Sequence, residues 1–218
     1  MIKKSGNSYT LLRHGESESN TLGLSNSEDL DIYHLTEKGR KEIEARAQEI
    51  AREGVDFIIS SDFLRTKETA RIIAVACNIP ENAIVYDKRL REYGVGKERE
   101  GKPWRETEAH VRNHGPYPDM ETPQEVKRRA FAALYDIDKK YSGKKILIVS
   151  HGAILNTLAH GVADTPSLDK VFHDSRRHFQ MTAEMQKLDF AKLPVNADFN
   201  LDLHRPFIDD VECVAPDG

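Results

Sequence analysis

Apolar residues follow two different spacings along this chain. Short continuous runs such as "YTLL", "FII" and "ILIV" are typical of buried β-strands. Between these runs, apolar residues recur every three or four positions, which is typical of helices with one buried face. Residues 36–54 show the helical spacing, with Thr36 placed as an N-cap and Gly54 placed where a helix ends.

The other predicted elements continue this alternation of strand and helix. The spacing predicts strands within residues 8–15, 55–61, 83–87 and 178–190, helices over residues 36–54, 62–79 and 122–143, and a strand that runs directly into a helix within residues 144–162. Strands that alternate with helices favour a three-layer α/β fold, in which a mostly parallel central sheet carries helices on both faces.

Three segments fall outside this pattern. Residues 16–34 are rich in Ser, Asn, Asp and Gly, so we expect a loop there. Residues 88–120 lack a period and contain several glycines and prolines, so we expect a long functional or mobile loop with helical pieces. Residues 191–218 are mostly polar and predict an extended tail. We therefore expect one domain over residues 1–190, followed by the tail.

Composition excludes several classes of protein. The chain of 218 residues carries 32 basic and 36 acidic residues, so it has no basic field that would attract nucleic acid, and we interpret its local run "KRRA" (127–130) as the solvated face of a helix. Its two cysteines are far apart in the sequence, which argues against a disulfide framework or a cysteine zinc site. No run of about 18 apolar residues predicts a membrane span, and the N-terminus lacks a secretory signal. We expect a cytoplasmic protein.

Candidate chemistry lies at the ends of three predicted strands. Arg13, His14 and Gly15 end the first strand, Arg65 lies one turn beyond the second, and His151 and Gly152 end the last long one. Ligands of parallel sheets bind beyond the carboxyl ends of the strands. If these strands are neighbours, two arginines and two histidines converge on one crevice.

Such a crevice suits a phosphoryl group. Guanidinium groups match tetrahedral oxyanions, and helix N-termini after two of the strands add backbone donors. A neutral histidine there could attack phosphorus, and Glu92, in a glycine-rich loop, could protonate the leaving group. Each residue alone has a more ordinary structural explanation, so the inference depends on their joint occurrence. Arginines beside the histidines disfavour a metal, and we expect no cofactor.

The motifs resemble those of a known family. The stretches "LLRHGESESN", "SSDFLRTKETA" and "VSHGAILNTL" are similar to the three signature blocks of the histidine phosphatase superfamily, the phosphoglycerate mutase-like proteins. The resemblance implies that His14 is the phosphorylated nucleophile and that Glu92 is the proton donor. It further implies a phosphate pocket whose other members are Arg13, Arg65, His151, Asn20, Gly15 and Gly152.

The same family contains mutases and phosphatases. The loop "LREYGVGKEREGK" resembles the phosphatase pattern. Mutases carry a double arginine in the insertion after this loop and an asparagine after the glycine of the last block, and this sequence lacks both. We therefore expect a phosphomonoester hydrolase that binds a small phosphorylated substrate or inorganic phosphate. A phosphoglycerate mutase and a binding module that does not hydrolyse its ligand are the alternatives.

The tail carries a second resemblance. Residues 201–211, "LDLHRPFIDDV", are similar to a segment of class I isoleucyl-tRNA synthetases. This resemblance implies that the chain is a phosphatase-like domain within or beside a longer synthetase chain, with the rest of that chain as its partner. No synthetase ATP-binding signature is present, so we do not expect this chain alone to aminoacylate tRNA.

Overall fold

The computed structural model of the chain describes residues 6–28, 31–162 and 180–188. Its centre is a five-stranded sheet with the order β3-β2-β4-β1-β5. The strands are β1 (Ser8–Arg13), β2 (Phe57–Ser60), β3 (Val85–Tyr86), β4 (Lys145–Ser150) and β5 (Met185–Lys187). All neighbouring pairs are parallel except β1 with β5. The prediction of a mostly parallel sheet is confirmed.

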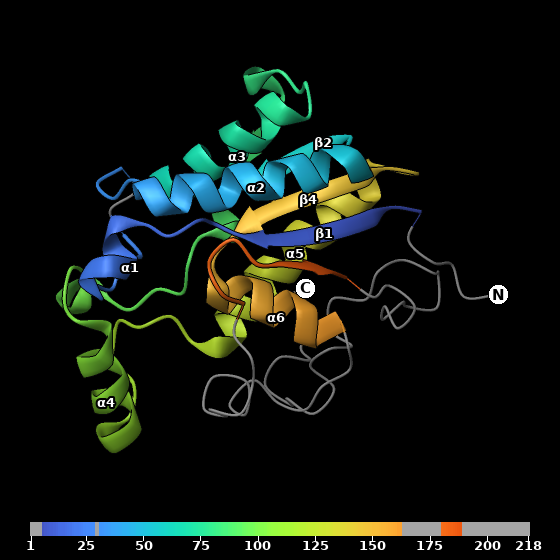
Figure 1. The fold of residues 1–218 in the computed structure, drawn as a ribbon. Helices are drawn as coiled ribbons and strands as arrows, with labels where there is room; N and C mark the ends of the chain where they lie inside the picture. Colours follow the sequence, from blue (N-terminus) through green and yellow to red (C-terminus); the bar gives the residue numbers. More distant parts are fainter. Residues whose placement is uncertain (1–5, 29–30, 163–179, 189–218) are drawn as a thin grey trace, which may run out of the picture.

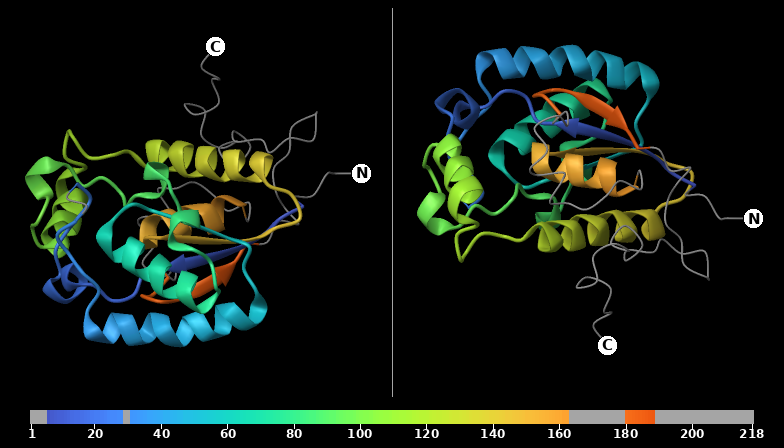
Figure 2. Two further views of the ribbon diagram at one scale, coloured as in Figure 1. Left: turned by 90° about the horizontal axis from the view of Figure 1, so that it is seen from above. Right: turned by 90° about the horizontal axis from the view of Figure 1, so that it is seen from below.

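Helices cover both faces of this sheet, as Figures 1 and 2 show. The α-helices are α1 (Glu18–Leu22), α2 (Glu37–Glu53), α3 (Leu64–Ala76), α4 (Trp104–His114), α5 (Pro123–Lys140) and α6 (Gly152–Val162), and the short 3₁₀ helices are η1 (Glu81–Ala83), η2 (Lys88–Leu90) and η3 (Lys97–Arg99). Among them, α2 and α3 lie on one face and α5 and α6 on the other. The predicted three layers are therefore present.

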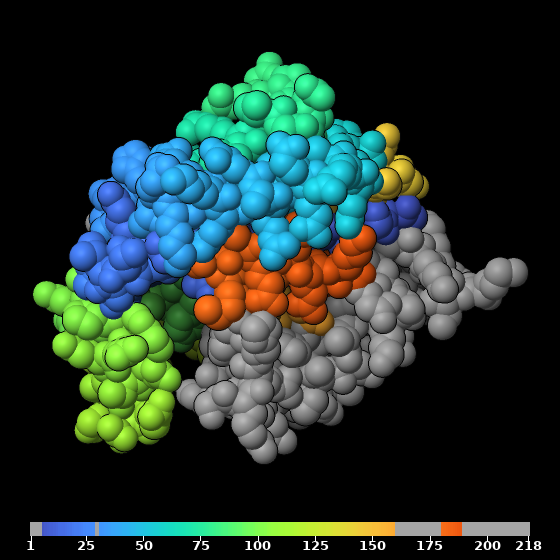
Figure 3. All heavy atoms as spheres, viewed as in Figure 1, coloured from blue at the N-terminus to red at the C-terminus, as the bar shows by residue number. Residues whose placement is uncertain are grey.

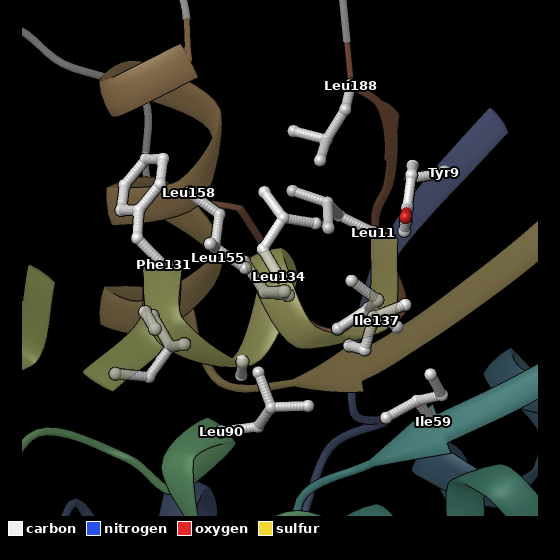
Figure 4. Packing of buried hydrophobic residues seen from close by; sticks show 14 of the residues in the cluster. Tyr9, Leu11, Ile59, Leu90, Phe131, Leu134, Ile137, Leu155, Leu158 and Leu188 are labelled. Atoms are coloured by element: carbon white, nitrogen blue, oxygen red, sulfur yellow. The ribbon is translucent and has the colours of Figure 1, made fainter. Parts of the chain in front are cut away.

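Adjacent residues of β1 pack into the two different halves of the core. Leu11 packs with residues of α5 and α6, whereas Leu12 packs with residues of α2 and α3, because successive side chains of a strand point to opposite faces. Figure 4 shows the first cluster, to which Leu134 of α5 and Leu155 of α6 belong together with Leu11. Both layers of helices are thus fixed directly to the strand that ends at the candidate site.

Local signals in the sequence explain where two helices begin. Thr36 caps α2 by accepting a hydrogen bond from Gly39 N at 3.0 Å, and Thr122 forms a capping box with Glu125 at the start of α5.

The interpretation of residues 127–130 as a solvated face is wrong, because Lys127 is only 4% exposed and the Arg129 side chain is only 20% exposed.

The long aperiodic segment begins against the core, where Leu90 is fully buried, and its later part lies beyond the sheet. It contains η2, η3 and α4, and Figure 1 shows α1 and α4 beyond the carboxyl ends of β1 and β4.

Figure 3 shows the segment that carries β5 at the surface next to α2, where Arg46 Nε donates to Ala183 O at 2.9 Å. No helix in the described part of the chain is long and apolar enough to cross a membrane. The predicted tail, 191–218, lies outside the described residues.

Candidate active site

Strand pairing places the two predicted histidines side by side. β1 and β4 run parallel in a register that sets Arg13 opposite Ser150, so His14 and His151 directly follow paired residues. Their ring centroids are 5.2 Å apart with an edge-on geometry. His14 is 2% exposed and His151 is fully buried. Two motifs separated by more than 130 residues thus form one site.

The protonation of His14 follows from its neighbours. Its Nδ1 lies 2.7 Å from the carbonyl oxygen of Gly15, which can only accept a hydrogen bond. The proton therefore sits on Nδ1, and the lone pair of Nε2 accepts from Arg65 Nε at 3.2 Å. The atom that could act as a nucleophile thus faces a guanidinium group.

Gly15 is required by a close approach between the turn and α2. A Cβ atom at this position would lie 2.6 Å from the carbonyl oxygen of Gly39. The N–H group of Gly15 donates to Thr69 Oγ1 at 3.3 Å. Within the described residues, Gly15 thus fixes the orientation of His14, and its predicted role in contacting substrate stays a prediction.

Arg65 joins the two histidines. It lies in the first turn of α3, is 4% exposed, and brings its Nη2 within 3.2 Å of His151 Nδ1. Since the guanidinium group donates there, His151 carries its proton on Nε2, which donates to Ser61 Oγ at 2.9 Å. Both imidazoles are neutral and both direct a lone pair at the same cation.

Arg13 approaches the site from the other side. Its Nη1 donates to the carbonyl oxygen of Gln180 at 2.7 Å, and its buried Nε has no hydrogen-bond partner among the described residues. A Cβ atom at Gly152 would lie 3.4 Å from the centre of this guanidinium group. Glycine at the start of α6 therefore lets Arg13 lie close to the helix backbone.

Burial and charge keep the histidines neutral. The pKa of His14 is held well below its usual value, first by burial and then by Arg65 and Arg13. The pKa of His151 is lowered in the same way, first by burial and then by Arg65. Burial also lowers the pKa of Arg65 to about 10, so this side chain stays charged at pH 7. The site pairs neutral imidazoles with fixed positive charge.

Glu92 lies in the loop that follows η2 and is partly buried. Its carboxylate favours the protonated forms of both Arg13 and Arg65 through its charge, which places it near the cations of the site. Its Oε1 accepts a hydrogen bond from Tyr93 N at 2.9 Å. The structure thus brings a carboxyl group to the same region as the histidine pair.

The structure places a different asparagine beside the site from the predicted one. Asn20 is exposed in α1, and its Oδ1 accepts from Ser17 N at 3.0 Å as part of a helix cap. Asn26 accepts hydrogen bonds from Arg65 through its side-chain and main-chain oxygens, and its Nδ2 donates to Glu100 Oε1 at 2.8 Å. Sequence reasoning missed Asn26 because it lies in a polar loop without a periodic signal.

Comparison with known proteins identifies the family of the chain. Residues 9–186 match the family model of the histidine phosphatase superfamily (branch 1). The chain is 34% identical over 199 residues to a probable phosphoglycerate mutase, GpmB, of Enterobacter sp. (strain 638), with 84% of this chain and 85% of the relative covered. GpmB of Yersinia pestis (strain Pestoides F) is 32% identical over 198 residues, with the same shares covered.

Solved structures show the same fold. YhfR of Bacillus stearothermophilus is 27% identical with a TM-score of 0.73, and the alignment covers 88% of this chain and 92% of that one. The mycobacterial glucosyl-3-phosphoglycerate phosphatase Rv2419c is 18% identical with a TM-score of 0.71, covering 84% and 92%. At that identity it supports the fold alone.

The two family resemblances seen in the sequence have different outcomes. The link to isoleucyl-tRNA synthetase finds no support, since the family match ends at residue 186, before the similar segment at 201–211, and none of the proteins named here is a synthetase. The match over 178 of the 218 residues includes every predicted site residue. The chain belongs to the histidine phosphatase superfamily (branch 1).

Proposed function

We propose that this protein hydrolyses phosphomonoesters through a phosphohistidine formed on His14. The observation that carries the proposal is the single guanidinium group of Arg65, which faces His14 Nε2 at 3.2 Å and His151 Nδ1 at 3.2 Å. Both nitrogens are neutral acceptors, so neither of them cancels its positive charge. A dianionic phosphoryl group would compensate it and would lie next to the nucleophile.

In the first step, His14 Nε2 attacks phosphorus while the bond from phosphorus to the ester oxygen breaks. Glu92 in its acid form gives its proton to that oxygen, and the alcohol leaves. Arg65 donates to the phosphoryl oxygens instead of to the imidazoles, and the unpartnered Nε of Arg13 provides a further donor. The Gly15 carbonyl accepts from Nδ1–H and stabilises the positive charge that develops on the ring.

In the second step, a water molecule replaces the alcohol. The Glu92 carboxylate removes a proton from it, its oxygen attacks phosphorus, and the N–P bond breaks. The lone pair returns to His14 Nε2, phosphate is released, and Glu92 is again protonated. Splitting the displacement in this way lets one carboxyl group serve as acid and then as base.

Hydrolysis is favoured over the mutase reaction, in which the phosphoryl group moves from one position of phosphoglycerate to another. The stretch "HVRNHG" (110–115), where the mutase pattern has a double arginine, carries only Arg112. Arg112 is exposed on α4 and pairs with Glu108 at 2.9 Å. Arg112 therefore forms an ion pair on the surface of α4 and is not directed at a substrate. The curated relatives are named as probable mutases and several fold neighbours as phosphatases, so the choice between the two reactions is part of the proposal.

The experiment compares the wild type with His14→Ala and Glu92→Gln on 4-nitrophenyl phosphate and on 3-phosphoglycerate. We expect turnover and an acid-labile phosphoprotein in the wild type and neither in His14→Ala. Equal turnover in both proteins would refute the proposal. Interconversion of phosphoglycerates that outpaces phosphate release would identify a mutase. Tight binding of phosphate without turnover would identify a binding module.

A further inference from the structure

Arg129 of α5 uses all five of its N–H donors on two segments, the loop at residues 89–92 and Glu121. Its Nη1 donates to the carbonyl oxygens of Arg89 at 2.8 Å and Arg91 at 2.7 Å, and its Nη2 donates to the carbonyl oxygen of Glu92 at 3.1 Å. Nε and Nη2 also bind the two carboxylate oxygens of Glu121 at 2.5 and 2.8 Å. A guanidinium group with every donor satisfied is held in one orientation.

Glu121 extends this contact to the other side of Glu92. Its Oε2 accepts from Gly94 N at 3.0 Å, and its main-chain N donates to Gly94 O at 2.8 Å. Arg129 and Glu121 are largely buried, with side-chain exposures of 20% and 19%. The pair therefore fixes the backbone on both sides of Glu92 through a bidentate ion pair with low solvent access.

Two further contacts tie the same loop to the sheet. Ser150 Oγ, at the end of β4, donates to Leu90 O at 2.7 Å. The Arg91 side chain binds Asp62, directly after β2, at 2.7 and 2.5 Å. These contacts fix the first part of the loop against the strand ends, but the backbone at Glu92 itself is held by Arg129.

We propose that Arg129 and Glu121 are positioning residues for Glu92, and that they set how well the enzyme expels strongly basic alcohols. The proposal rests on the proposed function, in which Glu92 is the general acid. An alkoxide needs a proton as it leaves, whereas nitrophenolate is a weak base and leaves without one. A displaced Glu92 thus lowers kcat/KM for alkyl esters and spares kcat/KM for the nitrophenyl ester, because kcat/KM reports the step in which the alcohol leaves. Hydrolysis of the phosphohistidine, for which Glu92 is the base, slows equally for both substrates. The phosphate pocket of Arg13, Arg65 and the histidines stays in place, because the strand ends hold it.

The test measures kcat/KM on a simple alkyl phosphate and on 4-nitrophenyl phosphate for the wild type, Arg129→Lys and Glu121→Gln. General acids contribute typically 10²–10⁴-fold, so we expect each variant to lose about 10- to 100-fold on the alkyl ester and less than about threefold on the nitrophenyl ester. Arg128→Gln is the matched control, since Arg128 is the exposed neighbour on the same helix, and we expect both substrates to be unaffected.

A double variant separates positioning from a general loss of structure. Adding Arg129→Lys to Glu92→Gln is expected to cause no further loss on the alkyl ester. Equal losses on the two substrates, or a further loss in the Glu92→Gln background, would overturn the positioning role. If Arg129→Lys fails to fold by circular dichroism, the two-substrate ratio of Glu121→Gln decides the question. A Glu92→Gln enzyme without any leaving-group preference would instead refute the proposed general acid.

Discussion

Acidification is expected to destabilise this fold through the two buried histidines of the candidate site. In the unfolded chain, a histidine takes up a proton near pH 6.5. In the folded protein, burial keeps the pKa of His14 and His151 well below that value. Below pH 6.5 the unfolded state therefore binds more protons than the folded state, so the free energy of unfolding falls as the pH falls. Above pH 6.5 the full stability is present.

The size of this effect follows from proton linkage. A group that is protonated only in the unfolded state changes the free energy of unfolding by about 1.4 kcal/mol per pH unit. At pH 5.5, one unit below the unfolded pKa, the two histidines together remove about 3 kcal/mol. Small proteins have about 5–15 kcal/mol of stability in total, so the loss is large enough to measure.

Other titrating groups act in a different pH range. The pKa values of Asp62 and Glu68 are lowered, chiefly through Arg91 in the first case and His34 in the second, against an opposing effect of burial. Their contributions are lost only as the pH falls below the ordinary carboxyl range of about 4. A fall in stability between pH 7.5 and 5.5 therefore reports on histidines.

The assay is urea unfolding followed by circular dichroism at half-unit steps between pH 7.5 and 5.5, in a buffer without phosphate. We expect His14→Asn and His151→Asn each to remove about half of the pH slope and the double variant to remove most of it. The slope is the readout, because each substitution also changes stability at every pH. A double variant with the slope of the wild type would show that these histidines are protonated in the folded state.

Three shorter predictions test single contacts. Asn26→Ala removes the side-chain oxygen that accepts a hydrogen bond from Arg65, and we expect it to lower kcat/KM for 4-nitrophenyl phosphate about 10- to 100-fold, the cost of a charged hydrogen bond. Glu100→Gln keeps an acceptor for Asn26 and should lower kcat/KM less than about tenfold. Wild-type rates in both variants would show that Asn26 has no role in the site. Gly39→Ala places a Cβ atom 2.0 Å from the carbonyl oxygen of Glu16, so urea unfolding should show a loss of about 1–3 kcal/mol; unchanged stability would mean that the turn adapts. Thr122→Ala removes the cap of α5 and should cost about 1 kcal/mol in the same assay.

Local signals were sufficient to predict the long helices, the strands and where several residues of the candidate site lie, whereas α1 falls within residues 16–34, for which the sequence predicted a loop. Thr36 and Thr122 identify helix starts because capping depends only on neighbouring backbone groups. Arg13, His14 and His151 were predictable because each lies directly at a strand end, and the carboxyl ends of parallel strands share one edge. The pairing that sets Arg13 opposite Ser150 was assumed rather than predicted, since strand order depends on contacts distant in sequence.

The contacts that sequence reasoning missed are all long-range. Asn26 reaches Arg65 from a loop 39 residues away, and Arg129 reaches the Glu92 loop from 37 residues away. The prediction of a solvated face at residues 127–130 treated charge as a sign of exposure. Arg129 is instead held between one carboxylate and three carbonyl oxygens, and such acceptors can be found only when the fold brings a loop and a helix together.

The active site therefore has two parts with separate supports. The cations and imidazoles are held by β1, β4 and the start of α3, which belong to the close-packed core. The carboxyl group is carried by a loop whose position near Glu92 depends on one arginine of α5. In the proposed function, phosphate binding depends on the first part, and protonation of the leaving group depends on the second. Substitutions around Arg129 can thus change which alcohols are released without changing how the phosphoryl group is held.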